Sequence, residues 1–239
     1  MLAKLINLIA PNETVRHEWV ERALYNLQSG GNILDVGCGT QRYSKFCEHL
    51  NYYGQDFGEY VADENSPGLQ NKSWDYGKLS YIGNCWDIDE RNKFFDNIIC
   101  TEVLEHIPYP NDTIKEFSRL IKPGGNLILT APYACLPHMQ PYFFYSGFSK
   151  EWYHEILSLN DFEILEISAN GNFFIFLLQE NIRSIKFIKY LPFKIIYSIA
   201  LLPMVALYYL ISKISNTDQL VFGYHVLAQK KLENQNDSR

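Results

Sequence analysis

Ile33-Leu34-Asp35-Val36-Gly37-Cys38-Gly39-Thr40 predicts a buried strand that ends on an acidic residue and leads directly into a glycine turn. The next apolar run, residues 51–56, also ends on an acidic residue, Asp56. A strand, a glycine loop and an acid about 20 residues further on are typical of a doubly wound α/β sheet that binds a nucleoside. The sequence therefore predicts an α/β fold with a nucleoside site at the end of its first strand.

The residues around the glycine turn distinguish between two classes of nucleoside ligand. A dinucleotide site needs a small residue at the position that Arg42 occupies, so that a helix can pack close to a pyrophosphate. In a dinucleotide site, the carboxylate of Asp35, two residues before Gly37, would also lie beside two phosphates, which is a poor position for an acid. A carboxylate at this position suits a ligand with an ammonium group, and Asp56 suits ribose hydroxyls. Both preferences match S-adenosylmethionine, which has an α-amino group and no phosphate.

On these residues the chain resembles the class I S-adenosylmethionine-dependent methyltransferases, of the type 11-like kind. The resemblance implies a Rossmann-like sheet of seven strands, with the last strand antiparallel and residues 220–229 forming it. Gln41 departs from the commonest family pattern, which has a third glycine at this position. The cofactor-binding residues that we expect are Asp35, Gly37, Cys38, Gly39, Asp56, Asn84, Cys85, Trp86, Thr101 and Glu102.

Two residues are candidates for the hydrogen bond to adenine. Many relatives have an acid at the position of Asn84, and an asparagine side-chain oxygen can still accept a hydrogen bond from the adenine amino group. Asp87 is the alternative partner, although we favour Asn84. The resemblance places the backbone N–H of Cys85 at the adenine ring and Trp86 over it.

Two further groups carry side chains that take part in chemistry. Glu102, Glu105 and His106 match residues that are linked to a divalent cation in quinone-biosynthesis O-methyltransferases, which this segment resembles. We favour the simpler interpretation, in which Glu105 and His106 brace the sheet edge through hydrogen bonds, and we assign no metal. His138 follows the fifth predicted strand, where an acceptor hydroxyl would meet a general base. A packing role for His138 is the alternative.

Hydrophobic periodicity predicts strands that alternate with helices, and hence a parallel sheet covered on both faces. A helix is expected from Asn12 to about Ser29, and residues 1–9 are expected to form a short amphipathic helix rather than a signal peptide. The remaining expected helices are residues 41–49, a helix from Asn111 or Asp112 to residue 121, and 149–159. The expected strands are residues 32–36, 51–56, 79–83, 94–101, 126–131, 162–167 and 220–229.

An apolar segment precedes the last predicted strand. Residues 195–211 carry no charge, and Pro203 lies in their middle. Because the chain must return to the sheet afterwards, we expect no membrane span. Residues 172–214 are expected to form a helical insertion, either at a membrane interface through 186–213 or as a cover for the sheet or a homodimer interface. Its flanking charges favour an anionic membrane surface: Arg183, Lys186, Lys189, Lys194 and Lys213, against Glu180.

Composition limits the classes of function. A chain of 239 residues is long enough for a single catalytic domain over 1–239. A net charge of −6 disfavours nucleic acid as a partner, and five cysteines without metal-ligand spacing are typical of a cytoplasmic protein. We expect methyl transfer to a small-molecule acceptor, at an oxygen of a sugar, lipid or related metabolite. The alternative is a non-catalytic protein of the same fold that binds S-adenosylmethionine or docks to a membrane, the latter at its cytoplasmic face.

Overall fold

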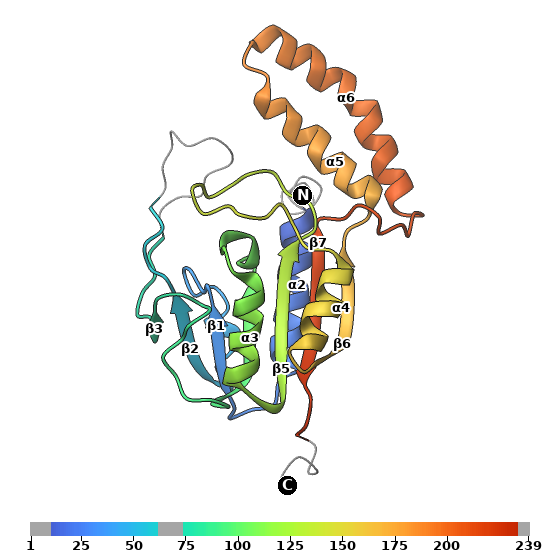
Figure 1. Ribbon diagram of the computed structural model, residues 1–239. Helices are drawn as coiled ribbons and strands as arrows, with labels where there is room; N and C mark the ends of the chain where they lie inside the picture. The colour runs from blue at the N-terminus through green and yellow to red at the C-terminus, as the bar shows by residue number, and fades with distance from the viewer. Residues whose placement is uncertain (1–10, 62–73, 234–239) are drawn as a thin grey trace.

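A seven-stranded mixed sheet forms the centre of the protein in a computed structural model, which describes residues 11–61 and 74–233 (Figure 1). The strand order is β3-β2-β1-β4-β5-β7-β6. β7 runs antiparallel to both of its neighbours, and the pairs from β3 to β5 are parallel. The predicted doubly wound sheet with an antiparallel last strand is confirmed. The strands are β1 Asn32–Val36, β2 Asn51–Asp56, β3 Tyr81–Ile82, β4 Phe95–Thr101, β5 Ile121–Pro132, β6 Phe162–Asn170 and β7 Gly223–Lys230.

Helices cover both faces of the sheet, because the central strands are apolar on both sides. α2 (Pro11–Tyr25) packs Val20 and Leu24 against one face, onto Ile33 of β1 and Ile128 of β5. On the other face, α3 (Pro110–Leu120) and α4 (Lys150–Leu159) bury their apolar sides. Figure 1 shows α3 and α4 in front of the sheet and α2 behind it. Parallel strands buried on both faces are the arrangement expected of this fold class.

The helix predicted over residues 41–49 is wrong. A series of turns and a single 3₁₀ turn, η1 (Ser44–Phe46), occupies this segment. Gln41 has a φ of +56°, which a right-handed helix cannot include, and its side-chain Nε2 donates to the carbonyl oxygens of Tyr76 and Lys78. The amide of Gln41 therefore ties the glycine turn to a distant loop, and a tighter turn replaces the helix.

The other predicted elements differ from the observed ones mainly at their ends. β3 has only two residues rather than five, and β5 begins at Ile121, five residues before the predicted start. Gly125 lies within β5 at a point where an added Cβ would meet the carbonyl oxygen of Asp96 at 2.6 Å. The glycine that suggested a turn therefore allows two strands to approach closely. The helix expected over residues 1–9 lies outside the described residues.

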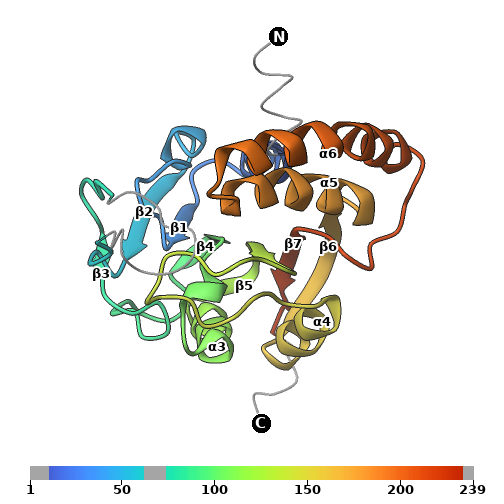
Figure 2. The ribbon, with the colours of Figure 1, turned by 90° about the horizontal axis from the view of Figure 1, so that it is seen from above.

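Two helices between β6 and β7 form an antiparallel hairpin that projects from the sheet (Figures 1 and 2). They are α5 (Phe173–Ser184), which continues into the 3₁₀ turn η3 (Ile185–Phe187), and α6 (Leu191–Ser212). Asn172 closes the base of the hairpin, because its side-chain Nδ2 donates to the carbonyl oxygens of Ser212 and Ser215. α6 is long and apolar enough to cross a membrane, and none of its residues is buried. α6 packs along α5, and many of its large apolar side chains are exposed.

Candidate functional site

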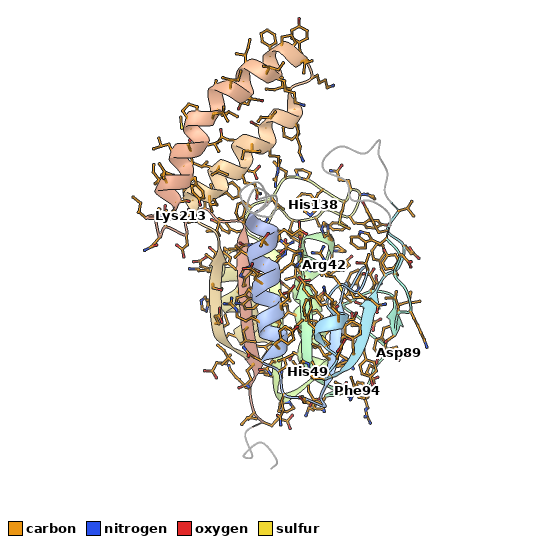
Figure 3. The ribbon with its side chains drawn as sticks, turned by 180° about the vertical axis from the view of Figure 1, so that it is seen from behind. Arg42, His49, Asp89, Phe94, His138 and Lys213 are labelled. Atoms are coloured by element: carbon orange, nitrogen blue, oxygen red, sulfur yellow. The ribbon has the colours of Figure 1, made fainter. Side chains whose placement is uncertain are left out.

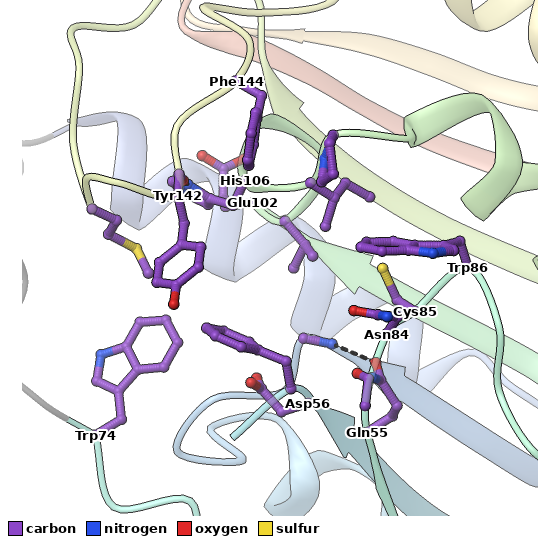
Figure 4. A pocket seen from close by; sticks show the side chains of 17 residues that line it. Gln55, Asp56, Trp74, Asn84, Cys85, Trp86, Glu102, His106, Tyr142 and Phe144 are labelled. Carbon is purple, nitrogen blue, oxygen red and sulfur yellow. Dashed lines mark hydrogen bonds between the residues drawn. The ribbon is translucent and has the colours of Figure 1, made fainter. Parts of the chain in front are cut away.

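Two adjoining cavities lie at the carboxyl ends of β1, β2 and β4. The smaller one has a volume of about 250 Å³ and lies toward β2 and β3 (Figure 4). The larger one has a volume of about 690 Å³ and lies between α2, the loop after β5 and α5. Ligands of open α/β sheets bind at this edge, where the strand order reverses between β1 and β4. The residues that border both cavities are Gly37, Trp74, Glu102, His106 and Met139.

The glycine turn after β1 forms the floor that the two cavities share. Gly37 has a φ of +63°, and a Cβ added there would lie 2.4 Å from a methyl carbon of Val103. Gly39 has a φ of +50°, and its added Cβ would meet the ring of Trp74 at 3.2 Å. Both glycines are needed for their backbone conformation, and Gly37 also for the close approach of the neighbouring strand end. Cys38 lies between them, and its backbone N–H donates to the carbonyl oxygen of Gln55 at 3.0 Å.

Asp56 stands at the end of β2, at the wall of the smaller cavity. Its Oδ2 accepts a hydrogen bond from the Gly39 N–H at 3.0 Å, and its Oδ1 accepts one from the Gly58 N–H at 3.1 Å. Burial raises the pKa of this carboxyl, and the backbone donors at Gly58 and Gly39 oppose the shift. Each oxygen keeps a second lone pair that can accept from a ligand hydroxyl.

The opposite wall of the smaller cavity comes from the loop after β3. Asn84, Cys85 and Trp86 line it, whereas Asp87 is not among the lining residues. The amide of Gln55, which sequence reasoning missed, holds this loop against the glycine turn. Its Nε2 donates to the carbonyl oxygen of Gly83 at 2.7 Å, and its Oε1 accepts from the Gly37 N–H at 3.4 Å.

Aromatic side chains complete the smaller cavity. Figure 4 shows Trp74 and Tyr142 on one side and Trp86 on the other. Phe57 makes an edge-to-face contact with Tyr142, with ring centroids 5.0 Å apart. A slot with flat apolar walls and a few polar atoms suits a planar base. Tyr142 belongs to the loop after β5. The many aromatic residues of this loop are visible in the sequence, but the place of the loop over the smaller cavity is not.

Asp35 is the last residue but one of β1 and lines the larger cavity. Its side chain is buried, and its Oδ2 accepts a hydrogen bond from the hydroxyl of Tyr52 at 2.7 Å. Burial raises the pKa of Asp35 to about 7, although the Tyr52 hydrogen bond opposes the shift. A carboxyl with this pKa is readily ionised by a cationic ligand, because a nearby positive charge favours the charged form.

Glu102 lies at the end of β4 with a φ of +53° and borders both cavities. Its Oε2 accepts from Arg16 of α2 at 3.0 Å, and its Oε1 accepts from the Thr130 hydroxyl at 3.1 Å. Thr101, next to it, lines the larger cavity. Arg16 was missed because nothing in the local pattern of α2 links it to a strand end 86 residues away.

Glu105, His106 and His138 meet at the upper edge of the sheet, with His106 in the wall of both cavities and His138 in the wall of the larger one. Figure 3 shows His138 at this edge and His49 toward the opposite end. Burial raises the pKa of Glu105 well above its usual range, and burial followed by the neighbouring His138 lowers the pKa of His106 to about 4. The structure thus brings His138 to Glu105 and His106, whereas Glu102, whose charge also raises the pKa of Glu105, is not part of this cluster.

The larger cavity is closed by α5 of the hairpin. Gln179 is buried there, and Glu180 forms an ion pair with Arg183 at 2.8 Å between Oε1 and Nη1. Lys186 also lines the cavity. No pattern in the sequence indicates that the insertion contributes to the site, because the contact depends on the path of the chain after β6.

A family model described as a methyltransferase domain matches residues 10–167. The chain belongs to the methyltransferase domain family. The match covers the glycine turn, Asp56, the loop after β3 and the end of β4, and it includes every residue that lines the smaller cavity.

Curated relatives of this methyltransferase domain include two ubiquinone biosynthesis O-methyltransferases. The protein from Coxiella burnetii (strain Dugway 5J108-111) is 34% identical over 130 residues, which are 53% of this chain and 52% of that protein. The one from Dechloromonas aromatica (strain RCB) is 31% identical over 120 residues, 48% of this chain and 50% of that protein. The chain thus spans about half the length of the curated relatives it matches.

Solved structures share the fold of the methyltransferase domain at low sequence identity. The [4+2]-cyclase SpnF has a TM-score of 0.54 and 16% identity, and the alignment covers 90% of this chain and 82% of that one. Phosphoethanolamine N-methyltransferase 2 from Haemonchus contortus, solved with S-adenosyl-L-methionine, has a TM-score of 0.52, 17% identity and coverages of 91% and 53%. A methyltransferase from Mesorhizobium loti has a TM-score of 0.52, 13% identity and coverages of 88% and 96%.

Proposed function

We propose that the protein is an S-adenosylmethionine-dependent O-methyltransferase that acts on a small-molecule acceptor. The observation that carries the proposal is the pair of adjoining cavities at the glycine turn. The smaller one suits a nucleoside, and the larger one has room for a second molecule. The curated relatives are named as O-methyltransferases, which supports oxygen as the acceptor atom.

The residues present fit the cofactor. Asp56 offers a free lone pair on each oxygen to the ribose hydroxyls, and Asn84 offers its side-chain oxygen to the adenine amino group. Cys85 offers its backbone N–H, and Trp86 an aromatic face. On the far side of Gly37, Asp35 faces the larger cavity, where its carboxylate pairs with an ammonium group. Asn84 is preferred to Asp87 because it lines the cavity.

Methyl transfer needs an acceptor oxygen aligned with a sulfonium, which supplies an electrophilic methyl group when the cofactor is bound. The reaction forms a carbon–oxygen bond, breaks a carbon–sulfur bond and releases the proton of the acceptor hydroxyl. His138 accepts that proton. Its Nδ1 lies 3.0 Å from the carbonyl oxygen of Leu136, which only accepts, so Nδ1 carries the hydrogen and Nε2 keeps a lone pair.

The test of this function is transfer of isotopically labelled methyl groups from S-adenosylmethionine to an extract of cellular metabolites and lipids. We expect labelled products that bear a new O-methyl group, identified by mass spectrometry, and we expect the His138→Ala variant to lose turnover far more than cofactor affinity. A protein that binds the cofactor and labels nothing would contradict catalysis. Equal turnover in the variant would remove His138 from the mechanism.

We also propose that the α5–α6 hairpin, an insertion of residues 172–214 into a single catalytic domain, contacts the cytoplasmic face of a membrane. Large apolar side chains of α6 are exposed, among them Ile196 at 63%, Ile199 at 62% and Leu202 at 65%. An apolar patch of this extent marks an interaction surface. Basic residues Lys186, Lys189 and Lys194 surround the free end of the hairpin, which suits anionic lipid headgroups.

The geometry of the hairpin favours surface insertion over a single span. Asn172 holds the two ends of the hairpin together, so the chain leaves and re-enters the catalytic domain at one place. Because α5 lines the larger cavity, a membrane contact would also bring lipid-soluble acceptors close to the site.

Vesicle sedimentation tests the membrane contact. We expect the protein to sediment with vesicles that contain anionic phospholipid. We expect weaker binding from a variant in which three lysines are changed together to Gln: Lys186, Lys189 and Lys194. The matched control has the same change of charge away from the hairpin, with Gln in place of Lys45, Lys78 and Lys93. Two results together would instead identify the patch as an interface between two copies of the chain. The protein would fail to bind anionic vesicles, and it would form a dimer in solution that Leu202→Ser weakens.

A further inference from the structure

The face that α5 turns toward the larger cavity carries polar side chains at regular intervals. Gln179, Ile182, Arg183 and Lys186 line the cavity, and their spacing places them on one side of the helix and of the 3₁₀ turn that continues it. Gln179 is buried, Arg183 is partly buried and Lys186 is exposed, so this face runs from the interior of the cavity to its mouth. Along the helix axis, Arg183 is about 6 Å from Gln179 and about 5 Å from Lys186.

Gln179 brings an unused amide group to this face. Only 5% of its surface is exposed, and its side chain has no hydrogen-bond partner among the described residues. A buried amide without a partner costs free energy. Because an amide both donates and accepts, a polar group of a ligand in the cavity would remove this cost.

The charged side chains of the larger cavity form three ion pairs. The pairs are Arg16 with Glu102 at 3.0 Å, Arg42 with Glu13 at 3.1 Å and Arg183 with Glu180 at 2.8 Å. Asp35 also lines the cavity, and the proposed function pairs its carboxylate with an ammonium group. Lys186 also lines it, and none of the described residues places a carboxylate within ion-pair distance of this lysine. The cavity therefore has a surplus positive charge once its carboxylates are paired.

Arg183 acts on the loop that carries His138. Burial, followed by the charges of Glu105 and Glu102, raises the pKa of Cys135 to about 12, and the charge of Arg183 lowers it. Cys135 comes three residues before His138, and both line the larger cavity. The charge of Arg183 therefore acts within the space in which the acceptor meets its base.

We propose that the methyl acceptor carries an oxyanion, in a carboxylate or phosphate group, which Arg183 and Lys186 bind at the mouth of the larger cavity. Residues three positions apart on a helix are neighbours, so both cations reach one oxyanion. A guanidinium has five N–H donors, so Arg183 can donate to an oxyanion while it keeps its contact with Glu180. Gln179, deeper in the cavity, binds a neutral polar group of the same molecule. That this molecule is the methyl acceptor rests on the proposed function, whereas the anion site does not.

Inorganic phosphate, added to the full-length protein with and without S-adenosylhomocysteine, tests the anion site. We expect a rise in Tm that saturates with phosphate concentration at constant ionic strength, and no such rise with chloride. Arg183→Gln is expected to weaken phosphate binding at least about fivefold, and Lys186→Gln to change it in the same direction. The matched controls remove exposed cations that do not line the cavity, Arg91→Gln and Lys115→Gln, and they retain the affinity.

Glu180→Gln gives the sharpest comparison, because it breaks the same ion pair from the opposite side. It removes the carboxylate that competes for Arg183, so we expect phosphate to bind more tightly. An ion pair that only stabilised the hairpin would lower the stability of both variants and leave their phosphate affinities equal. Opposite changes in affinity therefore support the anion site, and equal affinities of Arg183→Gln and Glu180→Gln overturn it.

The charge of the acceptor is measured separately. A metabolite and lipid extract is divided by anion exchange into a retained and an unretained fraction, and each is incubated with the protein and labelled S-adenosylmethionine. We expect labelled product from the retained fraction, in which mass spectrometry distinguishes a carboxylate from a phosphate. With this acceptor, Arg183→Gln is expected to raise KM at least about fivefold while kcat changes by less than about twofold.

The outcomes separate this inference from the proposed function. Labelled product from the unretained fraction alone overturns the anionic acceptor and leaves methyl transfer intact. Absence of a saturable rise in Tm with phosphate overturns the anion site without bearing on methyl transfer. Saturable phosphate binding without labelled product in either fraction contradicts the proposed function, and with it the assignment of the bound anion to a methyl acceptor.

Discussion

The two cavities are adjacent and share one floor, but they are built in different ways. The smaller one is formed largely where β1, β2, β3 and β4 end, and its polar atoms are held by backbone hydrogen bonds and by one amide, Gln55. The larger one is enclosed by charged side chains from α2 and α5, which pair with one another or with a strand end. The smaller cavity therefore depends on local strand-turn geometry, and the larger cavity depends on how distant segments meet.

Gly37→Ala is expected to have the largest effect on the smaller cavity. The new Cβ would lie 2.4 Å from Val103, and the φ of +63° is unfavourable for alanine. Strain and overpacking together predict a loss of about 2–4 kcal/mol in the free energy of unfolding, with loss of cofactor binding. Urea denaturation and calorimetry measure the two effects.

Gly30→Ala is the control for this substitution. Gly30 also has a positive φ, of +84°, but no atom lies within 4 Å of the added Cβ. It should therefore lose only about 1 kcal/mol, with normal cofactor affinity. Equal losses at the two positions would show that backbone conformation, rather than the close contact with Val103, explains the glycine at position 37.

Asp56→Ala is expected to weaken S-adenosylmethionine binding at least about tenfold, because it removes acceptors for the ribose hydroxyls. Asp87→Ala is the matched control, since Asp87 comes directly after the lining residues Asn84, Cys85 and Trp86 in the sequence but does not line the cavity itself. Binding measured by calorimetry should fall in the first variant and stay within about twofold in the second. A larger loss in Asp87→Ala would reverse the preference for Asn84 as the adenine partner.

The pH dependence of cofactor binding tests the larger cavity, because Asp35 lies in its wall, two residues before Gly37. Its pKa is raised to about 7 by burial, so the carboxyl is largely neutral below that pH and cannot pair with an ammonium group. We expect cofactor affinity to rise by up to about tenfold per pH unit below the pKa and to level off above it. Asp35→Asn should bind weakly at every pH, and a slope that persists in this variant would assign the titration to another group.

The raised pKa of Asp35 also makes the free energy of unfolding depend on pH, in a definite direction. An acid whose pKa is raised in the folded state takes up a proton on folding, so the stability it contributes is present at low pH and is lost as pH rises through about 7. The free energy of unfolding without ligand should therefore decrease between about pH 5 and pH 8 more steeply than in Asp35→Asn. Urea denaturation at the two pH values measures this, and parallel curves for the two proteins would contradict it.

Leu202→Ser in α6 is expected to have the smallest effect on folding. Leu202 is 65% exposed, so its replacement should change the free energy of unfolding by no more than about 0.5 kcal/mol while it weakens vesicle binding. Leu178→Ala in α5 is the contrast, because Leu178 is fully buried and its loss should cost about 2–5 kcal/mol. A strong destabilisation by Leu202→Ser would mean that the Leu202 side chain itself packs within the folded chain.

The comparison of the two cavities also explains which features could be read from the sequence. The carboxyl ends of β1, β2 and β4, the glycine turn and Asp56 are local features, and apolar runs bounded by glycine and polar residues located them. The helix expected over residues 41–49 failed because Gln41 bonds to carbonyl oxygens more than 30 residues away, which no local pattern shows. Arg16 and the side chains of α5 were missed for the same reason. His138 was singled out as a base, yet its meeting with Glu105 and His106 depends on the path of a loop.

Calorimetric titration of the full-length protein with S-adenosylmethionine and S-adenosylhomocysteine tests whether the smaller cavity binds the methyl donor. We expect one-to-one binding of both ligands at the glycine turn, with weaker binding of both by Asp56→Ala and unchanged binding by Gly30→Ala. A folded protein that binds neither ligand would contradict the assignment of the smaller cavity to the methyl donor.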